Sequence, residues 1–351
     1  MQFCVTKSGL EILDTCRAYG LAELVRALTR GRISPTICDL GGSFLIRTAT
    51  DIDARALPQS DEWRAVFAEN AWQQVFLTYK KQWPQQRDKV RKSIEQCYRE
   101  ILARAATGLG VDFGGPRTLP GALDPSAFKG LKGLTGGNYA EGATLVDEAS
   151  WALACLGGAV AQRYKLQRAA AKKWAYFVTV PVPSEVRFSD FRSIRNLVYG
   201  KGLSYNGVLN AAAHFSLLLA VSVREKAQGN PMFPVRFSRV AYFSLFQSGQ
   251  QYKPSMGGVV DVERLTRVAL ARPEAAAEMF TTWDYLFRRG STQGGEDLAE
   301  AITELITAPS FETYYQHARI FLRYIVDRNK GVKHENLYTK RALEEVINYV
   351  Q

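Results

Sequence analysis

The chain has 351 residues, of which 46% are hydrophobic and 11% aromatic, and its formal net charge is +11. This composition excludes wholesale disorder, and the length favours two domains because single cores rarely grow beyond about 250 residues. The basic balance suits a polyanionic partner, either nucleic acid or an anionic membrane surface.

The chain opens with a predicted helix over residues 10–30, where apolar residues recur at i, i+3, i+4 and i+7 from Leu21, and Gly31 follows as a stop. The segment TICDLGGSFLIRTAT then predicts a hairpin turning at Gly41-Gly42. Helices and strands are expected to alternate up to residue 255. They are a helix over 60–82 capped by Ser60 and ended by Pro84, a second helix to about 106, a helix over about 144–171, a strand at WAYFVTVPVP ended by its prolines, a buried helix over 203–225 and a strand at PVRFSRVAYFSLF.

The polar, glycine-containing stretch QSGQQYKPSMGG is interpreted as a loop, after which five helices and no strand are expected. Residues 256–351 carry 12 Lys and Arg against 14 Asp and Glu, a net charge of −2, so residues 1–255 carry +13. The predicted fold is α+β. A mixed, basic nucleic-acid-binding domain with a short hairpin and a small sheet spans 1–255, and an all-helical bundle spans 256–351.

Catalytic signatures are missing from the sequence. The three histidines have no metal-ligand spacing, the five cysteines form no CxxC pair, and neither a P-loop nor a GxSxG elbow occurs. Asp51 and Asp53 could form half of a metal site, but a solvated turn explains them better. No catalytic residue, metal or cofactor is therefore predicted. Because no apolar run reaches the roughly 20 residues of a membrane span and no signal peptide is evident, we expect a cytoplasmic protein.

Basic residues cluster with aromatic residues in three segments of the first domain, YKKQWPQQRDKVRK, RYKLQRAAAKKW and VRFSDFRSIRNLVYGKG. Cations neutralise phosphates and aromatic rings stack on unpaired bases, although a solvated helix face is the common alternative for any one such run. The residues chosen as backbone contacts are Lys80, Lys81, Arg87, Arg163, Arg168, Lys172 and Lys173.

A glycine-rich stretch over 108–142 holds 10 of the 28 glycines and is interpreted as a long loop. Glycines allow the backbone to approach a ligand closely. Lys129 and Lys132 add charge, Asn138 can read a base edge, and Tyr139 can stack or wedge. These four residues are predicted to read a DNA motif, and a mobile surface loop is the alternative.

Taken together, the chain resembles the large subunit of the type I CRISPR effector complex Cascade, especially the compact subunits of subtype I-A and related subtypes. The resemblance rests on YGLAELVRAL near the start, on VRFSRVAYFSLFQSGQQYKPSMGG, and on the all-helical end, which is similar to the separate small subunit.

The resemblance implies a non-catalytic subunit that contacts the 5′ region of the guide RNA beside the Cascade backbone subunits. It implies recognition of the protospacer-adjacent motif in double-stranded DNA and stabilisation of the R-loop, while guide pairing supplies sequence specificity. A helicase-nuclease or a transposition adaptor would be recruited as a further partner. No membrane partner is expected.

Three alternatives stay open at this stage. The chain could be a stand-alone DNA- or RNA-binding accessory protein of replication or repair, a metal nuclease using Asp51 and Asp53, or a protein that binds membrane surfaces. Met256 also precedes all five final helices, so an internal translation start there would yield a free small subunit.

Overall fold

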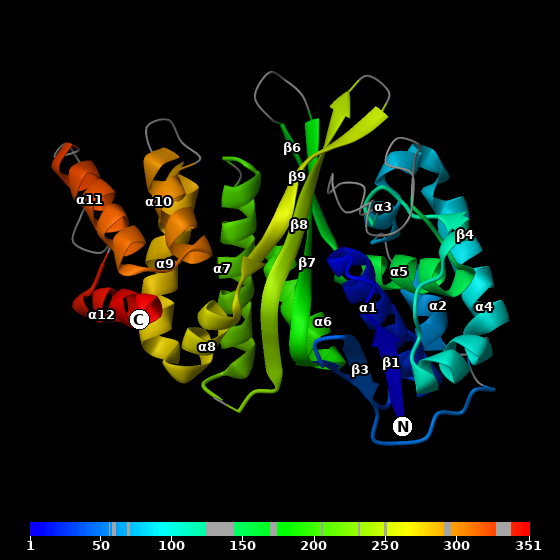
Figure 1. The fold of residues 1–351 in the computed structure, drawn as a ribbon. Coiled ribbons are helices and arrows are strands. Elements are labelled where there is room, and N and C mark those ends of the chain that lie inside the picture. Colours follow the sequence, from blue (N-terminus) through cyan, green and yellow to red (C-terminus); the bar gives the residue numbers. More distant parts are fainter. Residues whose placement is uncertain are drawn as a thin grey trace. The chain divides into compact units, whose positions relative to one another are not determined.

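The computed structural model describes residues 1–55, 57, 61–68, 71–123, 144–168, 174–204, 206–230, 232–248, 251–290, 296–327 and 338–351. It is an α+β structure, as predicted, with one main sheet and many helices (Figure 1). The chain divides into two compact units that are discontinuous in sequence. Unit 1 comprises residues 1–192 and 241–258, and unit 2 comprises residues 193–240 and 259–351. The division runs within α6, β8 and β9.

The main sheet has the strand order β1-β3-β2-β7-β8-β9, and β6 pairs with β7 outside this path. The strands are β1 (Gln2–Thr6), β2 (Thr36–Asp39), β3 (Ser43–Arg47), β6 (Arg163–Arg168), β7 (Trp174–Arg187), β8 (Val235–Ser248) and β9 (Gln251–Asp261). The hairpin predicted at Gly41-Gly42 is confirmed, because β2 and β3 pair antiparallel with Ile37 opposite Ile46. A separate two-stranded sheet joins β4 (Phe113–Thr118) to β5 (Leu145–Val146).

In unit 1, α1 packs on strands of the main sheet, α5 packs on α1, and α4 packs on α5 and β1. The helical elements up to residue 200 are α1 (Glu11–Leu28), α2 (Asp61–Ala68), α3 (Trp72–Val75), the 3-10 helix η2 (Leu77–Gln82), α4 (Trp83–Thr107), α5 (Glu148–Ala161) and α6 (Phe188–Gly200). The first predicted helix is thus confirmed. The helix predicted over 60–82 is instead broken into three short pieces, and Pro84 lies in the first turn of α4, where its missing N–H costs nothing.

Two glycines allow α1 and α5 to cross at backbone contact. A Cβ on Gly20 would lie 2.0 Å from the Leu153 carbonyl oxygen, and a Cβ on Gly157 would lie 1.7 Å from the Cys16 carbonyl oxygen. Neither side chain could be accommodated unless the helices moved apart. Tyr19 of α1 is also fully buried, and its hydroxyl donates to the Pro181 carbonyl of β7.

In unit 2, α7 packs against α8, α9 and α10, while α12 packs on α9 and α11 packs on α10 and α12. These helices are α7 (Val208–Ala227), α8 (Glu263–Ala271), α9 (Pro273–Gly290), α10 (Glu296–Thr307), α11 (Phe311–Asp327) and α12 (Lys340–Val350). The five helices predicted after residue 260 are confirmed as α8 to α12. Among the described residues, no helix combines the length and apolar content that crossing a bilayer requires.

A chain of polar contacts lies inside this bundle. Trp283 Nε1 of α9 donates to the Tyr338 hydroxyl at 2.9 Å, and that hydroxyl lies 2.7 Å from His317 Nε2 of α11. If Tyr338 donates onward to Nε2, the imidazole proton sits on Nδ1, which has no hydrogen-bond partner among the described residues. His317 is 3% exposed, and this burial lowers its pKa from 6.5 to about 4.

Three further sequence predictions about secondary structure are also wrong. The helix predicted over 144–171 ends at Ala161, and Arg163–Arg168 forms β6 because it pairs with β7 over its whole length. The supposed loop after residue 246 contains strand β9. Part of the glycine-rich stretch forms β4.

Strand β7 also runs past the prolines that were expected to end it. The ladder to β6 stops at Thr179 and the ladder to β2 starts at Glu185. Pro181 and Pro183 lie in the gap between these two ladders, where a missing N–H breaks neither of them.

The glycine crossing leads to a stability prediction. Gly20→Ala or Gly157→Ala should lower the free energy of unfolding by about 3 kcal/mol or more, because the new methyl group meets backbone that cannot rotate away. Gly158→Ala is the control in the same helix, since its Cβ meets the movable side chains of Leu123 and Val75 at 3.2 Å. Its effect should stay within about 1 kcal/mol. Equal effects in urea unfolding for Gly157→Ala and Gly158→Ala would contradict the close crossing.

Burial of neutral His317 leads to a pH prediction. Its pKa is lower in the folded than in the unfolded protein, so the unfolded state binds the proton first as the pH falls. Stability should therefore be lost between pH 6.5 and about 4, amounting to about 2 kcal/mol at pH 5. His317→Gln should remove most of this acid sensitivity in denaturant unfolding. An unchanged pH dependence in the variant would show that other groups cause it.

Candidate nucleic-acid interface

The residues predicted to contact nucleic acid fall into three groups. Lys129, Lys132, Asn138, Tyr139, Lys172 and Lys173 lie outside the described residues, as do the side chains of Lys80 and Arg168. Lys81 is exposed at the end of η2, and Arg87 is half-buried on α4. Arg163 is half-buried on β6, so it belongs to a strand and not to the helix expected there.

Helix α4 carries one face of exposed polar and basic side chains. Its buried residues include Val90, Ile94 and Ile101, which lie on the inner side of the helix. The exposed positions repeat with spacings of four and three residues, which keeps them on one face. We call this face, together with Lys81 just before the helix, the α4 stripe; it consists of Lys81, Gln85, Lys89, Lys92, Gln96 and Arg99.

The α4 stripe contains no carboxylate, because each acidic residue of α4 lies beside it and pairs with an arginine. Asp88 pairs with Arg87 at 3.0 Å, Glu95 lies 3.9 Å from Arg91, and Glu100 lies 3.9 Å from Arg104.

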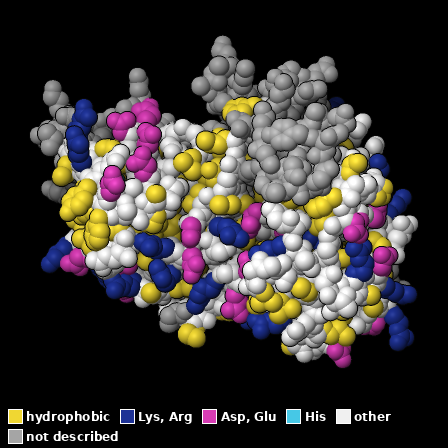
Figure 2. All heavy atoms as spheres, viewed as in Figure 1, with side chains coloured by type: hydrophobic (Ala, Val, Ile, Leu, Met, Phe, Trp, Pro, Cys, Tyr) yellow, Lys and Arg dark blue, Asp and Glu magenta, His cyan; other side chains and the backbone are white. Residues whose placement is uncertain are grey.

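Within the described part of the chain, Lys81, Lys89 and Lys92 form no ion pair. Figure 2 shows Lys and Arg side chains, with Asp and Glu side chains among them, on the surface at the right of the view, where Figure 1 places α4. The stripe therefore presents positive charge that no described carboxylate neutralises.

Several described cations of the first and third basic segments are engaged within the protein. In the first segment, Arg87 also lies over the Trp83 ring, with 5.7 Å between the guanidinium carbon and the ring centroid. In the third segment, Arg187 pairs with Asp190 at 2.6 Å and Lys201 pairs with Glu225 at 2.9 Å. These contacts support the common alternative for such runs, a structural role, and leave the α4 stripe as the best-defined candidate surface.

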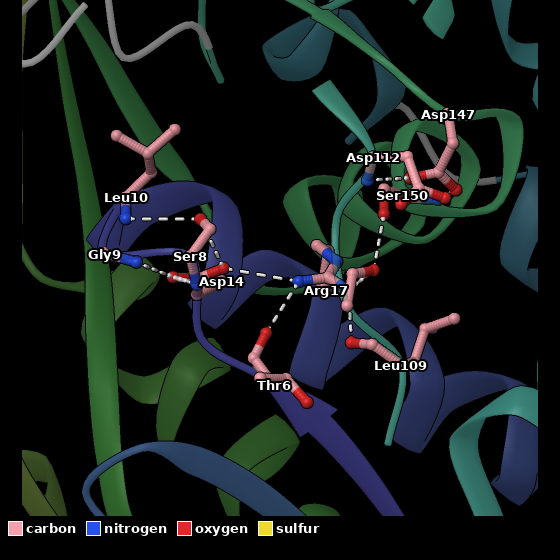
Figure 3. Close-up of polar contacts among 11 residues, drawn as sticks. Thr6, Ser8, Gly9, Leu10, Asp14, Arg17, Leu109, Asp112, Asp147 and Ser150 are labelled. Carbon is pink, nitrogen blue, oxygen red and sulfur yellow. Dashed lines mark hydrogen bonds and ion pairs between the residues drawn. The ribbon is translucent and has the colours of Figure 1, made fainter. Parts of the chain in front are cut away.

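A buried arginine fixes the surroundings of α4. Arg17 of α1 is fully buried, and Figure 3 shows its guanidinium among backbone carbonyls and a carboxylate. It donates to the carbonyls of Leu109 and Gly110 at 2.6 Å each, to Thr6 at 3.1 Å, and to Asp14 Oδ1 at 3.3 Å. These acceptors come from the end of β1, from α1 and from the segment that directly follows α4.

Asp14 is itself held by the turn before α1. It accepts hydrogen bonds from the backbone N–H groups of Ser8 and Gly9 and from the Ser8 hydroxyl (Figure 3). Burial raises the pKa of Asp14, although Arg17 and these hydrogen bonds act in the opposite direction. The pair is thus a desolvated ion pair whose other hydrogen-bond partners are mostly backbone groups. Arg17 Nε has no hydrogen-bond partner among the described residues.

The same cluster extends to the start of α5. Asp147 caps this helix by accepting from Ser150 N, and it also accepts from Asp112 N. Arg104, in the last turn of α4, lies 3.4 Å from Asp112 and 3.8 Å from Asp147. Burial would raise the pKa of Asp147, but these hydrogen bonds and Arg104 hold it below its usual value. The C-terminal end of α4 is thereby tied to both α1 and α5.

A histidine–aspartate pair in unit 2 was missed by sequence analysis. His214 of α7 is fully buried, with Nε2 2.7 Å from Asp284 Oδ1 of α9. His214 Nδ1 accepts the backbone N–H of Ser204, whose hydroxyl donates to the Phe287 carbonyl. Since the serine hydroxyl points to a carbonyl and not to the imidazole, this is a clamp between helices and not a catalytic triad. His214 is therefore a core histidine whose two ring nitrogens both have hydrogen-bond partners.

Asp51 and Asp53 lie on an exposed turn, where Asp53 Oδ1 accepts from Arg55 N. The part of the chain that the structure describes holds no group of three or more His, Cys, Asp or Glu side chains arranged to bind a metal ion.

No protein-family model matches the chain. An uncharacterized protein of Archaeoglobus fulgidus (strain ATCC 49558 / DSM 4304 / JCM 9628 / NBRC 100126 / VC-16) is 25% identical to it over 364 residues. The match covers 99% of this chain and 98% of that protein. The similarity therefore extends over nearly the whole of both chains and brings no functional description with it.

The buried arginine gives a prediction that can be checked by unfolding. Arg17→Met should lower the free energy of unfolding by about 3–5 kcal/mol, because it leaves Asp14 and the carbonyls of Leu109 and Gly110 buried without their donor. Arg64→Met removes an arginine from an exposed pair with Asp61 and should cost less than about 1 kcal/mol. Similar losses in the two variants would contradict the role given to Arg17.

Proposed function

We propose that this protein binds nucleic acid without catalysing a reaction, and that the α4 stripe contacts the sugar-phosphate backbone. The observation that carries the proposal is the run of exposed Lys and Gln side chains on one face of α4, with every carboxylate of the helix paired beside it. Lysines release counterions when they contact phosphates, and glutamine amides donate hydrogen bonds to phosphate oxygens.

The dimensions of the stripe suit this role. From Gln85 to Arg99 the helix rises by about 21 Å, and the phosphates of one strand follow each other at about 3.4 Å along a duplex axis. A straight helix of this length can follow several phosphates at once. The stripe carries no aromatic side chain, so stacking on unpaired bases is not part of the proposed contact.

At a finer level, we propose that the chain is the large subunit of a type I Cascade-like effector and acts in the cytoplasm. The support is an α+β unit with a basic face, a second unit that is mainly helical, and the sequence features that resemble this family. In this proposal the partners are a guide RNA, duplex target DNA, backbone subunits and a recruited helicase-nuclease or transposition adaptor. Lys129, Lys132, Asn138 and Tyr139 remain the proposed readers of the adjacent motif.

The main alternative is a stand-alone nucleic-acid-binding accessory protein of replication or repair. It uses the same α4 stripe, so the stripe does not separate the two functions. The two functions predict different complexes. An effector subunit is bound to a guide RNA and backbone subunits, whereas an accessory protein binds nucleic acid on its own.

The α4 stripe can be tested by charge removal. The triple variant Lys89→Gln, Lys92→Gln and Arg99→Gln should weaken binding to a random-sequence duplex by about tenfold or more at low salt. The slope of log K against log salt should fall by about 3, since each lost phosphate contact removes about 0.9. Fluorescence anisotropy at several salt concentrations measures both quantities.

The control removes three exposed cations elsewhere, by Arg32→Gln, Arg267→Gln and Lys340→Gln. It changes the net charge equally but leaves the α4 stripe intact, so its salt slope should stay close to that of the unmodified protein. Equal losses in both triple variants would show that overall charge, and not the α4 stripe, accounts for binding.

A further inference from the structure

Helix α11 exposes large apolar side chains along one line. Phe311, Tyr315 and Leu322 are 52%, 70% and 59% exposed, and Ala318 between them is half-buried. The four positions are spaced by four, three and four residues, which is the spacing of a two-helix seam. We call them the α11 seam. Hydrophobic side chains gather at the left of Figure 2, over α11 and α12.

The α11 seam is separate from the face by which α11 joins its own bundle. That inner face carries His317 and Phe321, which are buried, and it packs on α10 and α12. The core of unit 2 therefore does not use the seam residues. Exposed aromatic side chains aligned along a helix are typical of a surface that a second protein covers.

Charged side chains beside the α11 seam are arranged with opposite signs at its two ends. Glu312 lies beside Phe311 near the start of the helix, and Arg319 lies beside Ala318 further along, and both are exposed. Two such helices running in opposite directions bring Glu312 of each copy near Arg319 of the other. In a parallel pair Glu312 of one copy would instead lie level with Glu312 of the other, seven residues from Arg319, so the opposite charges would not meet.

The apolar residues of the α11 seam also match each other in an antiparallel pair. When two copies are aligned antiparallel, Phe311 of one faces Leu322 of the other, and Tyr315 faces Ala318. In this register Phe311 meets Leu322, the large Tyr315 meets the small Ala318, and Glu312 comes within two residues, or about 3 Å along the axis, of Arg319. A surface that is complementary to itself under a two-fold rotation is what a symmetric dimer requires.

From this geometry we propose that the α11 seam docks against the α11 seam of a second copy of this chain, as an antiparallel helix pair. The seam spans about 16 Å from Phe311 to Leu322, so the buried area falls below the roughly 1,200 Å² of a stable standard interface. The pairing is therefore a weak, reversible self-association, and it is independent of the α4 stripe and of the function proposed above.

Sedimentation equilibrium of the full chain over concentrations up to about 100 µM tests the proposal. A monomer–dimer equilibrium is expected, and Tyr315→Glu or Leu322→Glu should raise its Kd by about tenfold or more, because a carboxylate would be buried in the seam. Met232→Glu is the matched control, since Met232 is 80% exposed and lies outside α11, and it should leave the Kd unchanged. A protein that stays monomeric throughout this range overturns the proposal.

A charge exchange tests the antiparallel arrangement and its self-complementarity. Glu312→Arg and Arg319→Glu should each weaken association, because each places like charges across the pair. Combining the two changes restores opposite charges and should return the Kd to within about threefold of the original value. If the double variant is as weak as the single variants, the two helices do not pair in this way.

Discussion

Arg17 is a cation placed where water cannot reach it, and its hydrogen bonds join β1 and α1 to Leu109, which lies 92 residues further along the chain. Its acceptors lie on β1, on α1 and on the segment that follows α4. A buried guanidinium is tolerated only when such acceptors are in place, so these parts must assemble together. The contact of α1 with α5 at Gly20 and Gly157 adds the same requirement for close, fixed packing.

The burial of Arg17 also fixes the position of the candidate interface, because its contacts hold the C-terminal end of α4. Leu109, directly after the helix, bonds to both β1 and Arg17, while Arg104 lies near the cap of α5. With its inner side held against the core, α4 turns Lys89 and Lys92 outward. Arg87, Arg91 and Arg104 pair with the carboxylates of the helix, and this leaves its lysines available to an external anion.

Local periodicity was enough to predict α1, the β2–β3 hairpin and the final helices, because each follows from short-range spacing of apolar residues. It failed at β6, the segment RYKLQR, which was assigned to the helix predicted over 144–171, because pairing with β7 decides the structure there. The role of Arg17 could not be predicted, since its carbonyl acceptor at Leu109 is 92 residues away. The α4 stripe could have been predicted from the sequence, because Gln85, Lys89 and Lys92 are spaced by four and three residues, which places them on one face of a helix.

The central claim is that this protein binds nucleic acid. The most direct measurement is to co-express the tagged chain with its chromosomal neighbours, purify it, and sequence the nucleic acid that it retains. The account predicts short RNAs of uniform length with a constant 5′ end, retained in a complex with a multi-copy subunit. Random fragments that are lost in moderate salt would favour the accessory protein. A purified protein free of nucleic acid, which also fails to bind added duplex or RNA at low salt, would contradict the central claim.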